Sequence, residues 1–268
     1  MKVKSDKLNV RLIKFPFKGI PLTRFIPNMT TLLGLCVGLT AVYHALHQNW
    51  ERALWFVVIA TVFDGMDGRL ARLFNASSRF GAELDSLSDF VTFGVSPALV
   101  VYFHSLHSLG RLGWGVVLFF CICSGLRLAR FNTMSIETDP GSTTNVPLNK
   151  YFIGVPMPLA GLLILTPLMV YIDTGYPLHP MVYAFWGALI GGLMISKIPT
   201  FAFKGVKIQP NQVLLLLGAM GIFAIGIMTR PWLTIPMAGI VYLTSFVLSY
   251  HYYKKELILQ APDSADTP

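Results

Sequence analysis

The sequence predicts an all-α protein that crosses a membrane about eight times, with a basic amphipathic segment before the first crossing. Three observations predict this fold class. Of the 268 residues, 54% are apolar and 13% are charged, and that charged content is about half of what a soluble domain carries. Apolar runs of about the length that spans a bilayer recur along the whole chain. The basic residues gather on one side of the arrangement that these runs produce.

Polar or turn-forming stretches bound each predicted helix. HQNWE separates the first apolar run from the second, and SLGRLG separates the third from the fourth. The longest polar connection, TMSIETDPGSTTNVPLNK, precedes the fifth run, DTGYPLHP precedes the sixth, and TRP separates the last two. We therefore expect helices at 28–47, 51–73, 81–106, 113–131, 151–172, 181–197, 211–229 and 231–253. They form one transmembrane domain, 28–253, and the polar tail, 254–268, has the composition of a disordered segment.

The distribution of Lys and Arg predicts the orientation in the membrane. Eight spans put both termini on one side, and assigning that side to the cytoplasm leaves only Arg52, Arg111 and Arg230, of 21 Lys and Arg residues, outside. Such an asymmetry follows the positive-inside rule. We therefore expect an integral protein of a bacterial inner (cytoplasmic) membrane, with both termini facing the cytoplasm.

The N-terminal segment, 1–27, interleaves Lys and Arg with large apolar residues such as Leu12, Phe15 and Phe17. This pattern is typical of a basic amphipathic segment on an anionic leaflet, although a positively charged flank of the first span would explain the charges alone. The formal net charge of +8 does not indicate a nucleic-acid partner. The basic residues lie at membrane boundaries and form neither a single stripe nor a known nucleic-acid-binding fold.

Four aspartates stand out because they lie inside apolar runs, and we call Asp64, Asp67, Asp85 and Asp89 the aspartate cluster. Asp64 lies 13 residues from Glu51 and Asp89 lies 15 residues from His104, about 20 and 22 Å along two antiparallel helices. The two therefore reach a similar depth. Spacings of i, i+3 and i, i+4 put each pair on one helix face. If these faces meet, four carboxylates converge in a cavity that opens to the cytoplasm.

Carboxylates at this depth need compensating positive charge, because each costs on the order of 3 kcal/mol in the bilayer centre. Arg69, Arg72 and Arg79 could neutralise part of the charge. Two Mg²⁺ or Mn²⁺ ions would compensate more fully, since both prefer oxygen ligands and share them with phosphate. The alternatives are a structural Asp–Arg network and a divalent-cation transporter. A transport path would need acids spread along a route through the membrane, and the other spans contain none.

Small residues flank the acids. Gly65, Gly68 and Ala71 on one helix and Gly81 on the other leave room for a large ligand beside the backbone, although helix packing also uses small residues. Arg72, one turn past Gly68, is placed to meet a phosphate.

The spaced pattern D-x2-D-G-x2-A-R-x8-G-x3-D-x3-D resembles the signature of the CDP-alcohol phosphatidyltransferase family at all eight positions. The similarity extends to the IPNMTT stretch, with Asn28 at its centre. The resemblance implies a membrane-embedded helical enzyme, often a homodimer, that moves a phosphatidyl group from a CDP-linked lipid to an alcohol and releases CMP. It also implies that the aspartate cluster holds two metal ions, and that Asp89 takes the proton of the acceptor hydroxyl. Asn28, Gly68, Ala71 and Gly81 would then contact the CDP group, and Arg72 its diphosphate.

The acceptor is indicated by the segments GLRLARFN, YFIGVPMP and TFGVSPALV, which resemble those of the small integral-membrane phosphatidylserine synthases. Val155 and Met157 depart from the usual form of the second segment. This resemblance implies transfer from CDP-diacylglycerol to L-serine. A carboxylate is well recognised by arginine, so the candidate acceptor-binding residues are Arg127, Arg130, Asn132 and Lys150.

Other interpretations remain open. The basic residues among these candidates could be positive-inside anchors. Glycerol 3-phosphate, inositol phosphate or choline could replace serine as the acceptor. Intramembrane prenyltransferases also carry aspartates on helices, but in two clusters far apart, and this chain has a single one.

Overall fold

The computed structural model describes residues 25–74, 76, 78–136, 151–196, 199–201 and 210–244 of the chain. Most of the predicted N-terminal segment, Lys150 and the predicted tail lie outside the described residues, as do residues 245–253 of the last predicted span. The predictions made for those parts therefore stay predictions.

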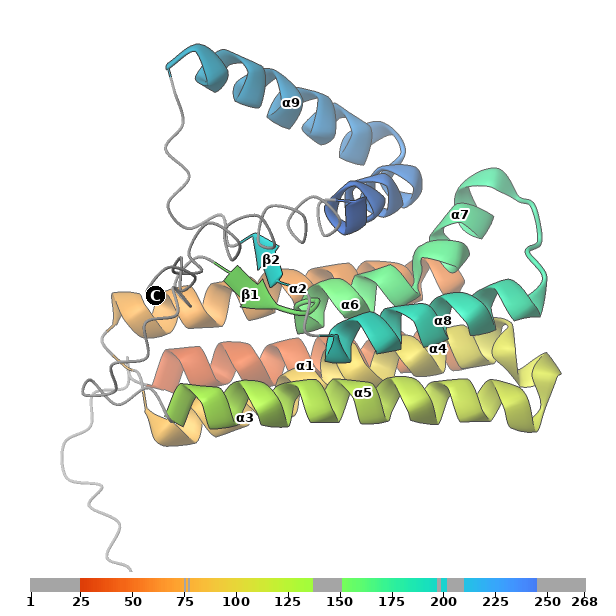
Figure 1. Ribbon diagram of the computed structural model, residues 1–268, viewed down its shortest axis with the longest axis horizontal. Helices are drawn as coiled ribbons and strands as arrows, with labels where there is room; N and C mark the ends of the chain where they lie inside the picture. Colours follow the sequence, from red (N-terminus) through yellow and green to blue (C-terminus); the bar gives the residue numbers. More distant parts are fainter. Residues whose placement is uncertain are drawn as a thin grey trace, which may run out of the picture.

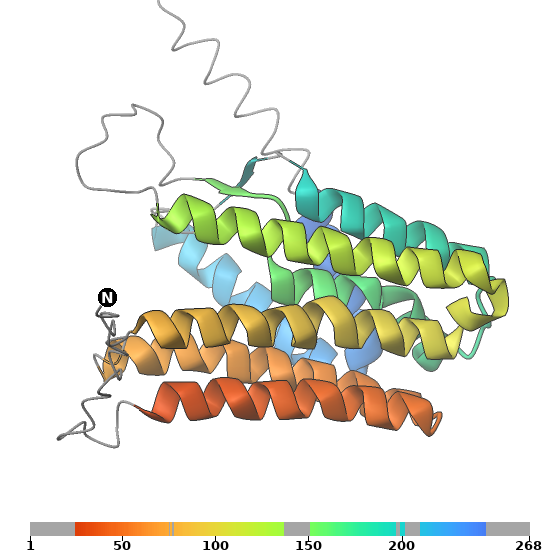
Figure 2. The ribbon, with the colours of Figure 1, turned by 90° about the horizontal axis from the view of Figure 1, so that it is seen from below.

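The described chain is helical apart from one short two-stranded sheet. Its elements are α1 (Ile26–Leu46), α2 (Trp50–Leu73), α3 (Arg79–Asp89), the π-helix η2 (Phe90–Val95), α4 (Ser96–His104), the 3₁₀-helix η3 (Leu106–Leu109), α5 (Arg111–Ile136), β1 (Tyr151–Ile153), α6 (Met157–Ile164), α7 (Thr166–Thr174), α8 (Pro180–Ile195), β2 (Pro199–Phe201), α9 (Pro210–Thr229) and a last described helix, Pro231–Thr244. The longer helices lie side by side along one axis, while α9 leaves the bundle at an angle (Figure 1). The same bundle is visible from below (Figure 2), and α1 packs most extensively against α2.

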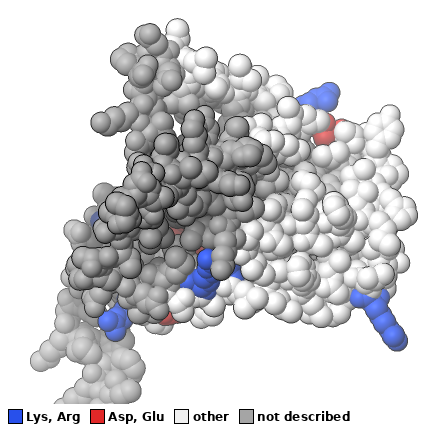
Figure 3. Space-filling model, in the orientation of Figure 1, with Lys and Arg blue, Asp and Glu red and all other residues white. Residues whose placement is uncertain are grey.

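The outside of the bundle is apolar, as expected of a surface that faces lipid. Leu33, Ile122 and Leu214 are 54%, 60% and 80% exposed. White, uncharged residues cover most of the part of this face that is not drawn in grey, and coloured charged residues appear at only a few places on it (Figure 3). In water such a surface would drive aggregation, whereas in a bilayer it removes the need for a polar exterior. The chain is therefore a helical integral membrane protein.

The structure supports part of the predicted span count. Ile26–Leu46, Arg79–His104 and Arg111–Thr133 are each long and apolar enough to cross a bilayer, and the bent pair α6–α7 would make a fourth span. Among the described residues, Pro180–Ile195, Val213–Thr229 and Pro231–Thr244 are apolar but shorter.

The predicted helix at 151–172 is wrong at its start and in its continuity. Tyr151–Ile153 forms β1, which pairs with β2 in antiparallel register, and α6 begins only at Met157. Gly154 has a φ of +78°, a left-handed conformation, and Pro156, the residue before α6, has an extended ψ of 148° that keeps it outside the helix. A bend of 42° then separates α6 from α7, where Pro167 enters the first turn of α7.

The third predicted span is one continuous helical segment, but it changes its winding directly after Asp89. The α-helical turns of α3 give way to the π-helix η2 and return as α4, which has Pro97 in its first turn. Ser78 caps the start of α3, since its hydroxyl oxygen accepts a hydrogen bond of 3.0 Å from the Gly81 amide. Inserted π turns are frequent at functional sites.

Small residues bring α1 close to the two helices that carry the aspartates. Gly34, Gly38, Ala41 and Ala45 are all buried on one face of α1. A Cβ added at Gly38 would lie 2.7 Å from the Thr92 methyl carbon in η2. Such close backbone approach is typical of small-residue packing in membranes.

We expect Gly38→Val to push α1 away from η2 and to lower the free energy of unfolding by about 1–3 kcal/mol, the usual cost of overpacking. The measurement is thermal denaturation of the purified protein in detergent. Gly115→Val is the matched control, because a Cβ at Gly115 would meet nothing within 4 Å. Equal stability of both variants would contradict this interpretation of α1 packing.

Candidate active site

The aspartate cluster comes together where α2 and α3 face each other beside α1, which packs against both helices. Oxygens of Asp64, Asp67 and Asp85 all lie within 4.8 Å of one another. The Asp89 side chain lies within hydrogen-bonding range of Asp64. Asp67 is buried, and the other three are partly buried. Because α2 and α3 run antiparallel and both pack against α1, the site gathers residues that are up to 25 positions apart in the chain.

Within the described residues no Lys or Arg forms an ion pair with the aspartate cluster. The ion pair found among the described residues lies elsewhere and joins Asp173 on α7 to Arg230, the residue after α9. Arg72, one of the arginines predicted to neutralise the cluster, uses its Nε to donate a hydrogen bond of 3.2 Å to the Gly68 carbonyl oxygen. These contacts do not support a structural Asp–Arg network.

The donor set fits a hard divalent cation. All its side-chain ligands are carboxylate oxygens, the ligands that Mg²⁺ and Mn²⁺ prefer. Oxygens that bind one ion at about 2.0–2.6 Å can be up to about 5 Å apart, which matches the spacing of the three aspartates. In addition, Asp85 Oδ1 is buried and has no hydrogen-bond partner in the structure. A buried carboxylate oxygen without a donor is costly unless a cation satisfies it.

α1 contributes a residue to the site that sequence reasoning missed. The Thr31 hydroxyl lies 2.9 Å from Asp67 Oδ2 and 3.0 Å from the Pro27 carbonyl oxygen, so these two acceptors share its single proton, and both Thr31 and Asp67 are buried. The Thr31 carbonyl oxygen in turn accepts a hydrogen bond of 3.2 Å from the Ser88 hydroxyl on α3. Thr31 therefore connects all three helices of the site. Thr31 lies in the IPNMTT stretch, four residues after Pro27, but nothing in the spacing of the sequence indicates its contact with Asp67.

A cavity of about 220 Å³ opens beside the cluster, and most of the predicted CDP-binding residues line it. Asn28, Gly68, Ala71 and Gly81 line this cavity together with Asp67 and Asp85. A Cβ at Gly81 would lie 2.9 Å from Asn28 Oδ1, whereas one at Gly68 would meet nothing within 4 Å. Glycine at 81 thus leaves room for the Asn28 amide, and glycine at 68 leaves the α2 wall of the cavity open. Arg72 is exposed and does not line the cavity.

The predicted acceptor residues lie on α5 where they are described. Arg127 is partly buried, lies within electrostatic range of Asp89, and has an Nε with no hydrogen-bond partner in the structure. Asn132 exchanges hydrogen bonds of 3.2 and 3.4 Å with Ser86, the residue after Asp85. Among the described residues, Arg130 forms no side-chain hydrogen bond or ion pair with the cluster, and Lys150 lies outside those residues. Arg127 and Asn132 are therefore the acceptor candidates that lie near α3.

Comparison with protein families identifies the fold that holds this site. A model of the family described as CDP-alcohol phosphatidyltransferase matches residues 24–201, a range that includes every site residue named above. The chain belongs to the CDP-alcohol phosphatidyltransferase family. A second model, described as CDP-alcohol phosphatidyltransferase 2, matches residues 211–246, which include the last two described helices.

The chain is similar to several bacterial proteins named CDP-diacylglycerol–serine O-phosphatidyltransferase. The protein of Mycobacterium tuberculosis is 36% identical over 228 residues, which cover 84% of this chain and 78% of that protein. The protein of Helicobacter pylori is 33% identical over 89% of this chain and 96% of its own length. The protein of Bacillus subtilis is 35% identical over 67% of this chain and 92% of its own length. CDP-alcohol phosphatidyltransferases generally depend on divalent metal ions, which agrees with the carboxylate donor set.

We expect Thr31→Val to weaken Mn²⁺ binding about tenfold or more, because residues that orient a metal ligand typically contribute that much affinity. Valine keeps the shape of threonine but cannot donate to Asp67. Free and bound Mn²⁺ are distinguished by electron paramagnetic resonance on the purified protein. Thr31→Ser should restore binding, and Thr40→Val, on an exposed turn of the same helix, is the matched control. Unchanged Mn²⁺ affinity in Thr31→Val would contradict the role given to this hydroxyl.

Proposed function

We propose that the protein transfers the phosphatidyl group of CDP-diacylglycerol to the hydroxyl of L-serine, giving phosphatidylserine and CMP in phospholipid biosynthesis. The observation that carries this proposal is the aspartate cluster opening into a cavity lined by Asn28, Gly68, Ala71 and Gly81. The serine O-phosphatidyltransferase relatives support the choice of donor and acceptor.

The aspartates are assigned to two divalent ions, Mg²⁺ or Mn²⁺. When bound, these ions supply positive charge to the diphosphate oxygens and hold attacking and leaving oxygens in line. Asp64, Asp67 and Asp85 provide the close group of ligands, and Asp89 is the fourth. The Thr31 hydroxyl fixes the orientation of Asp67.

The CDP group is assigned to the cavity beside the cluster. Asn28 offers an amide that can donate and accept hydrogen bonds with a base or ribose. The cavity walls carry little side chain at Gly68, Ala71 and Gly81, so a nucleotide can approach the backbone of both helices. Arg72 is assigned to the diphosphate, which requires its guanidinium to exchange the Gly68 carbonyl for phosphate oxygens.

In the transfer step, the serine hydroxyl oxygen attacks the phosphorus that carries the diacylglycerol. A new phosphorus–oxygen bond forms to serine, the bond to the bridging diphosphate oxygen breaks, and CMP leaves with that oxygen. Asp89 takes the hydroxyl proton, because it is the last acid of α3 and lies deepest in the span. Arg127, within range of Asp89, is assigned to the serine carboxylate, while Asn132, Arg130 and Lys150 are assigned supporting roles.

Membrane topology and assembly belong to the same proposal. We assign eight spans, with the active site and both termini on the cytoplasmic side of a bacterial inner membrane. The basic segment 1–27, the transmembrane domain 28–253 and the tail 254–268 are the three parts of the chain. A homodimer is the assigned oligomeric state, from the resemblance described above.

A divalent-cation transporter is the candidate from another class. The other acids of the described helices are Glu51, Glu83 and Asp173. Glu51 and Asp173 lie at helix ends, Asp173 is paired with Arg230, and Glu83 is exposed. These residues provide no continuous acidic path across the bundle, which favours the transferase.

The test is CMP release from CDP-diacylglycerol by the purified protein. Release should require a divalent cation and serine, and chelation should abolish it. Asp89→Asn should lower the rate about 10²–10⁴-fold, the range expected for loss of a general base. Glu83→Gln, the same change on an exposed turn of α3, should leave the rate nearly unchanged.

A release of CMP that does not depend on serine, but responds to another alcohol, would replace the acceptor and keep the enzyme class. Uptake of Mn²⁺ into liposomes without CMP formation would instead favour the transporter.

Arg127→Lys should raise KM for serine about tenfold or more and change KM for CDP-diacylglycerol less than about twofold. Lysine keeps the charge but loses the planar, two-pronged donor geometry that suits a carboxylate. Steady-state kinetics with each substrate varied in turn provides the measurement. Arg111→Lys, at the far end of the same helix, is the control. Parallel increases in both KM values would indicate a general role in site structure and remove the serine assignment.

A further inference from the structure

A second, small cavity of about 10 Å³ lies on the side of the aspartate cluster that faces the middle of the bundle. Ala60, four residues before Asp64 on α2, and Thr92, three residues after Asp89, both line it. The larger cavity described above lies toward the opposite end of the same two helices. The aspartate cluster therefore lies between two cavities of very different size.

The small cavity has the size and the lining that suit one water molecule. A buried water needs roughly 10–15 Å³ of free space and two to four polar partners. The carboxylates of Asp64 and Asp89 and the hydroxyl of Thr92 belong to the lining and supply three partners. The small residues Gly34 and Ala60 complete the wall on α1 and α2 and leave the space open.

The Thr92 hydroxyl is the group that indicates a bound molecule. Thr92 is only 2% exposed, and its Oγ1 has no hydrogen-bond partner among the described residues. The other hydroxyls of the lining already donate, because the Ser88 proton goes to the Thr31 carbonyl oxygen and the Thr31 proton to Pro27 and Asp67. A buried hydroxyl without a partner is costly, so a partner for Thr92 is expected in the cavity.

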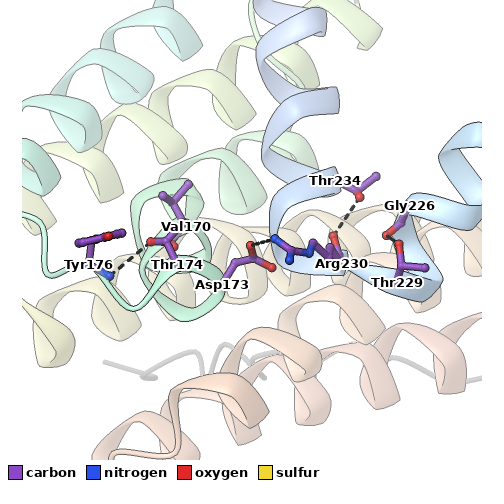
Figure 4. Close-up of polar contacts among 8 residues, drawn as sticks. All are labelled: Val170, Asp173, Thr174, Tyr176, Gly226, Thr229, Arg230 and Thr234. Atoms are coloured by element: carbon purple, nitrogen blue, oxygen red, sulfur yellow. Dashed lines mark hydrogen bonds and ion pairs between the residues drawn. The ribbon is translucent and has the colours of Figure 1, made fainter.

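The winding of the backbone explains why Thr92 does not bond to its own helix. A helical threonine can donate to a carbonyl oxygen of the preceding turn. Thr40 and Thr61 do so, and Figure 4 shows the same contact between Thr234 and the Arg230 carbonyl oxygen. Thr92 lies in the π-helix η2, whose backbone bonds reach five residues back instead of four. The wider turn moves the carbonyl oxygen four residues before Thr92 away from the hydroxyl.

Packing against α1 holds the Thr92 side chain beside the cavity. A Cβ added at Gly38 would lie 2.7 Å from the Thr92 methyl carbon and 3.1 Å from its Oγ1. Both branches of the side chain therefore face α1 closely. Because threonine is also stiff at χ1, the hydroxyl has little freedom to find another partner.

We propose that one water molecule occupies the small cavity, accepts a hydrogen bond from the Thr92 hydroxyl and donates one to each of the carboxylates of Asp64 and Asp89. Thr92 is then a positioning residue, which orients two metal-binding carboxylates through this water. The proposal rests on the function proposed above, since it needs these aspartates to be ligands of divalent ions.

The arrangement satisfies every polar group that it contains. The water uses both of its protons and one lone pair, and the Thr92 hydroxyl gains an acceptor. Two protons directed at neighbouring carboxylates also reduce the repulsion between Asp64 and Asp89. Carboxylates that bind a metal are usually held by such outer hydrogen bonds. Thr31 provides one to Asp67 directly, and Thr92 provides the equivalent for the two deeper aspartates through water.

The test is the Mn²⁺ affinity of the purified protein, measured by electron paramagnetic resonance. Thr92→Val keeps the branched shape that packs against Gly38 but removes the hydroxyl, and should weaken Mn²⁺ binding about tenfold or more. Thr92→Ser keeps the hydroxyl and should restore most of the affinity. Thr61→Val is the matched control, because the Thr61 hydroxyl bonds to its own helix and does not line the small cavity.

The two Thr92 variants also distinguish positioning from packing. If Thr92 acts only by filling space against α1, Thr92→Ser, which lacks the methyl group, would lose affinity and Thr92→Val would not. That result would overturn the proposal, as would unchanged Mn²⁺ affinity in both variants.

A high-resolution crystal structure of the Mn²⁺ complex tests the same proposal on the unmodified protein. One water should lie about 2.5–3.0 Å from Thr92 Oγ1 and from an oxygen of each of Asp64 and Asp89. A Thr92 hydroxyl that bonds to a carbonyl oxygen of its own helix, or that binds a metal ion directly, would overturn the proposal.

Metal binding separates this proposal from the proposed function, because Mn²⁺ affinity is measured without CDP-diacylglycerol or serine. Weaker Mn²⁺ binding by Thr92→Val, together with no CMP release by the unmodified protein, would retain the role of Thr92 and reject the transferase. Normal CMP release by the unmodified protein, together with unchanged Mn²⁺ affinity in Thr92→Val, would retain the transferase and reject the role of Thr92.

Discussion

Concentrating four carboxylates inside an apolar helical bundle is the constraint on which the rest of this structure depends. Like charges at this depth are costly without a counter-charge, and no basic side chain of the described residues pairs with them. The surrounding helices hold the acids at fixed positions. Close packing at Gly38 keeps α1 against η2, and the hydroxyl of Thr31 then reaches Asp67. Asp85 belongs to the same group, and its Oδ1 is buried without a hydrogen-bond partner. The arrangement is therefore complementary to positive charge that the chain itself does not supply.

Much of the site could be predicted from the sequence because its main elements are local patterns. Helical spacing put Asp64 with Asp67 and Asp85 with Asp89 on single faces, and the turn between α2 and α3 made the two faces antiparallel. The contribution of α1 to the site was harder to predict from the sequence. Asn28 was found only through a family resemblance, and Thr31 was missed, because its role arises from a contact with a residue 36 positions away. Such contacts leave no periodic signal in one sequence.

The fold was harder to predict where an apolar run conceals a change of backbone. Residues 151–172 have the hydropathy of one span, yet β1 is extended because it pairs with β2, almost fifty positions later. The break between α6 and α7 at Leu165 also leaves the hydropathy unchanged, although Pro167 indicates it. The lengths of the spans were also hard to predict, because Pro180–Ile195 is shorter than a usual transmembrane helix. Hydropathy measures how a segment partitions into lipid and carries little information about its continuity.

The π-helix η2 separates two halves of one helical segment that serve different neighbours. A π turn contains one residue more than an α turn, and each residue of an α-helix advances the side-chain direction by about 100°. The half that carries Asp85 and Asp89 is therefore rotated relative to α4, whose Ala98, Val100 and Val101 are buried in the core. The extra residue therefore changes the direction of the side chains of α4 relative to those of α3. Evolution could consequently adjust the contacts of α4 with the core without turning the carboxylates away from their partners on α2.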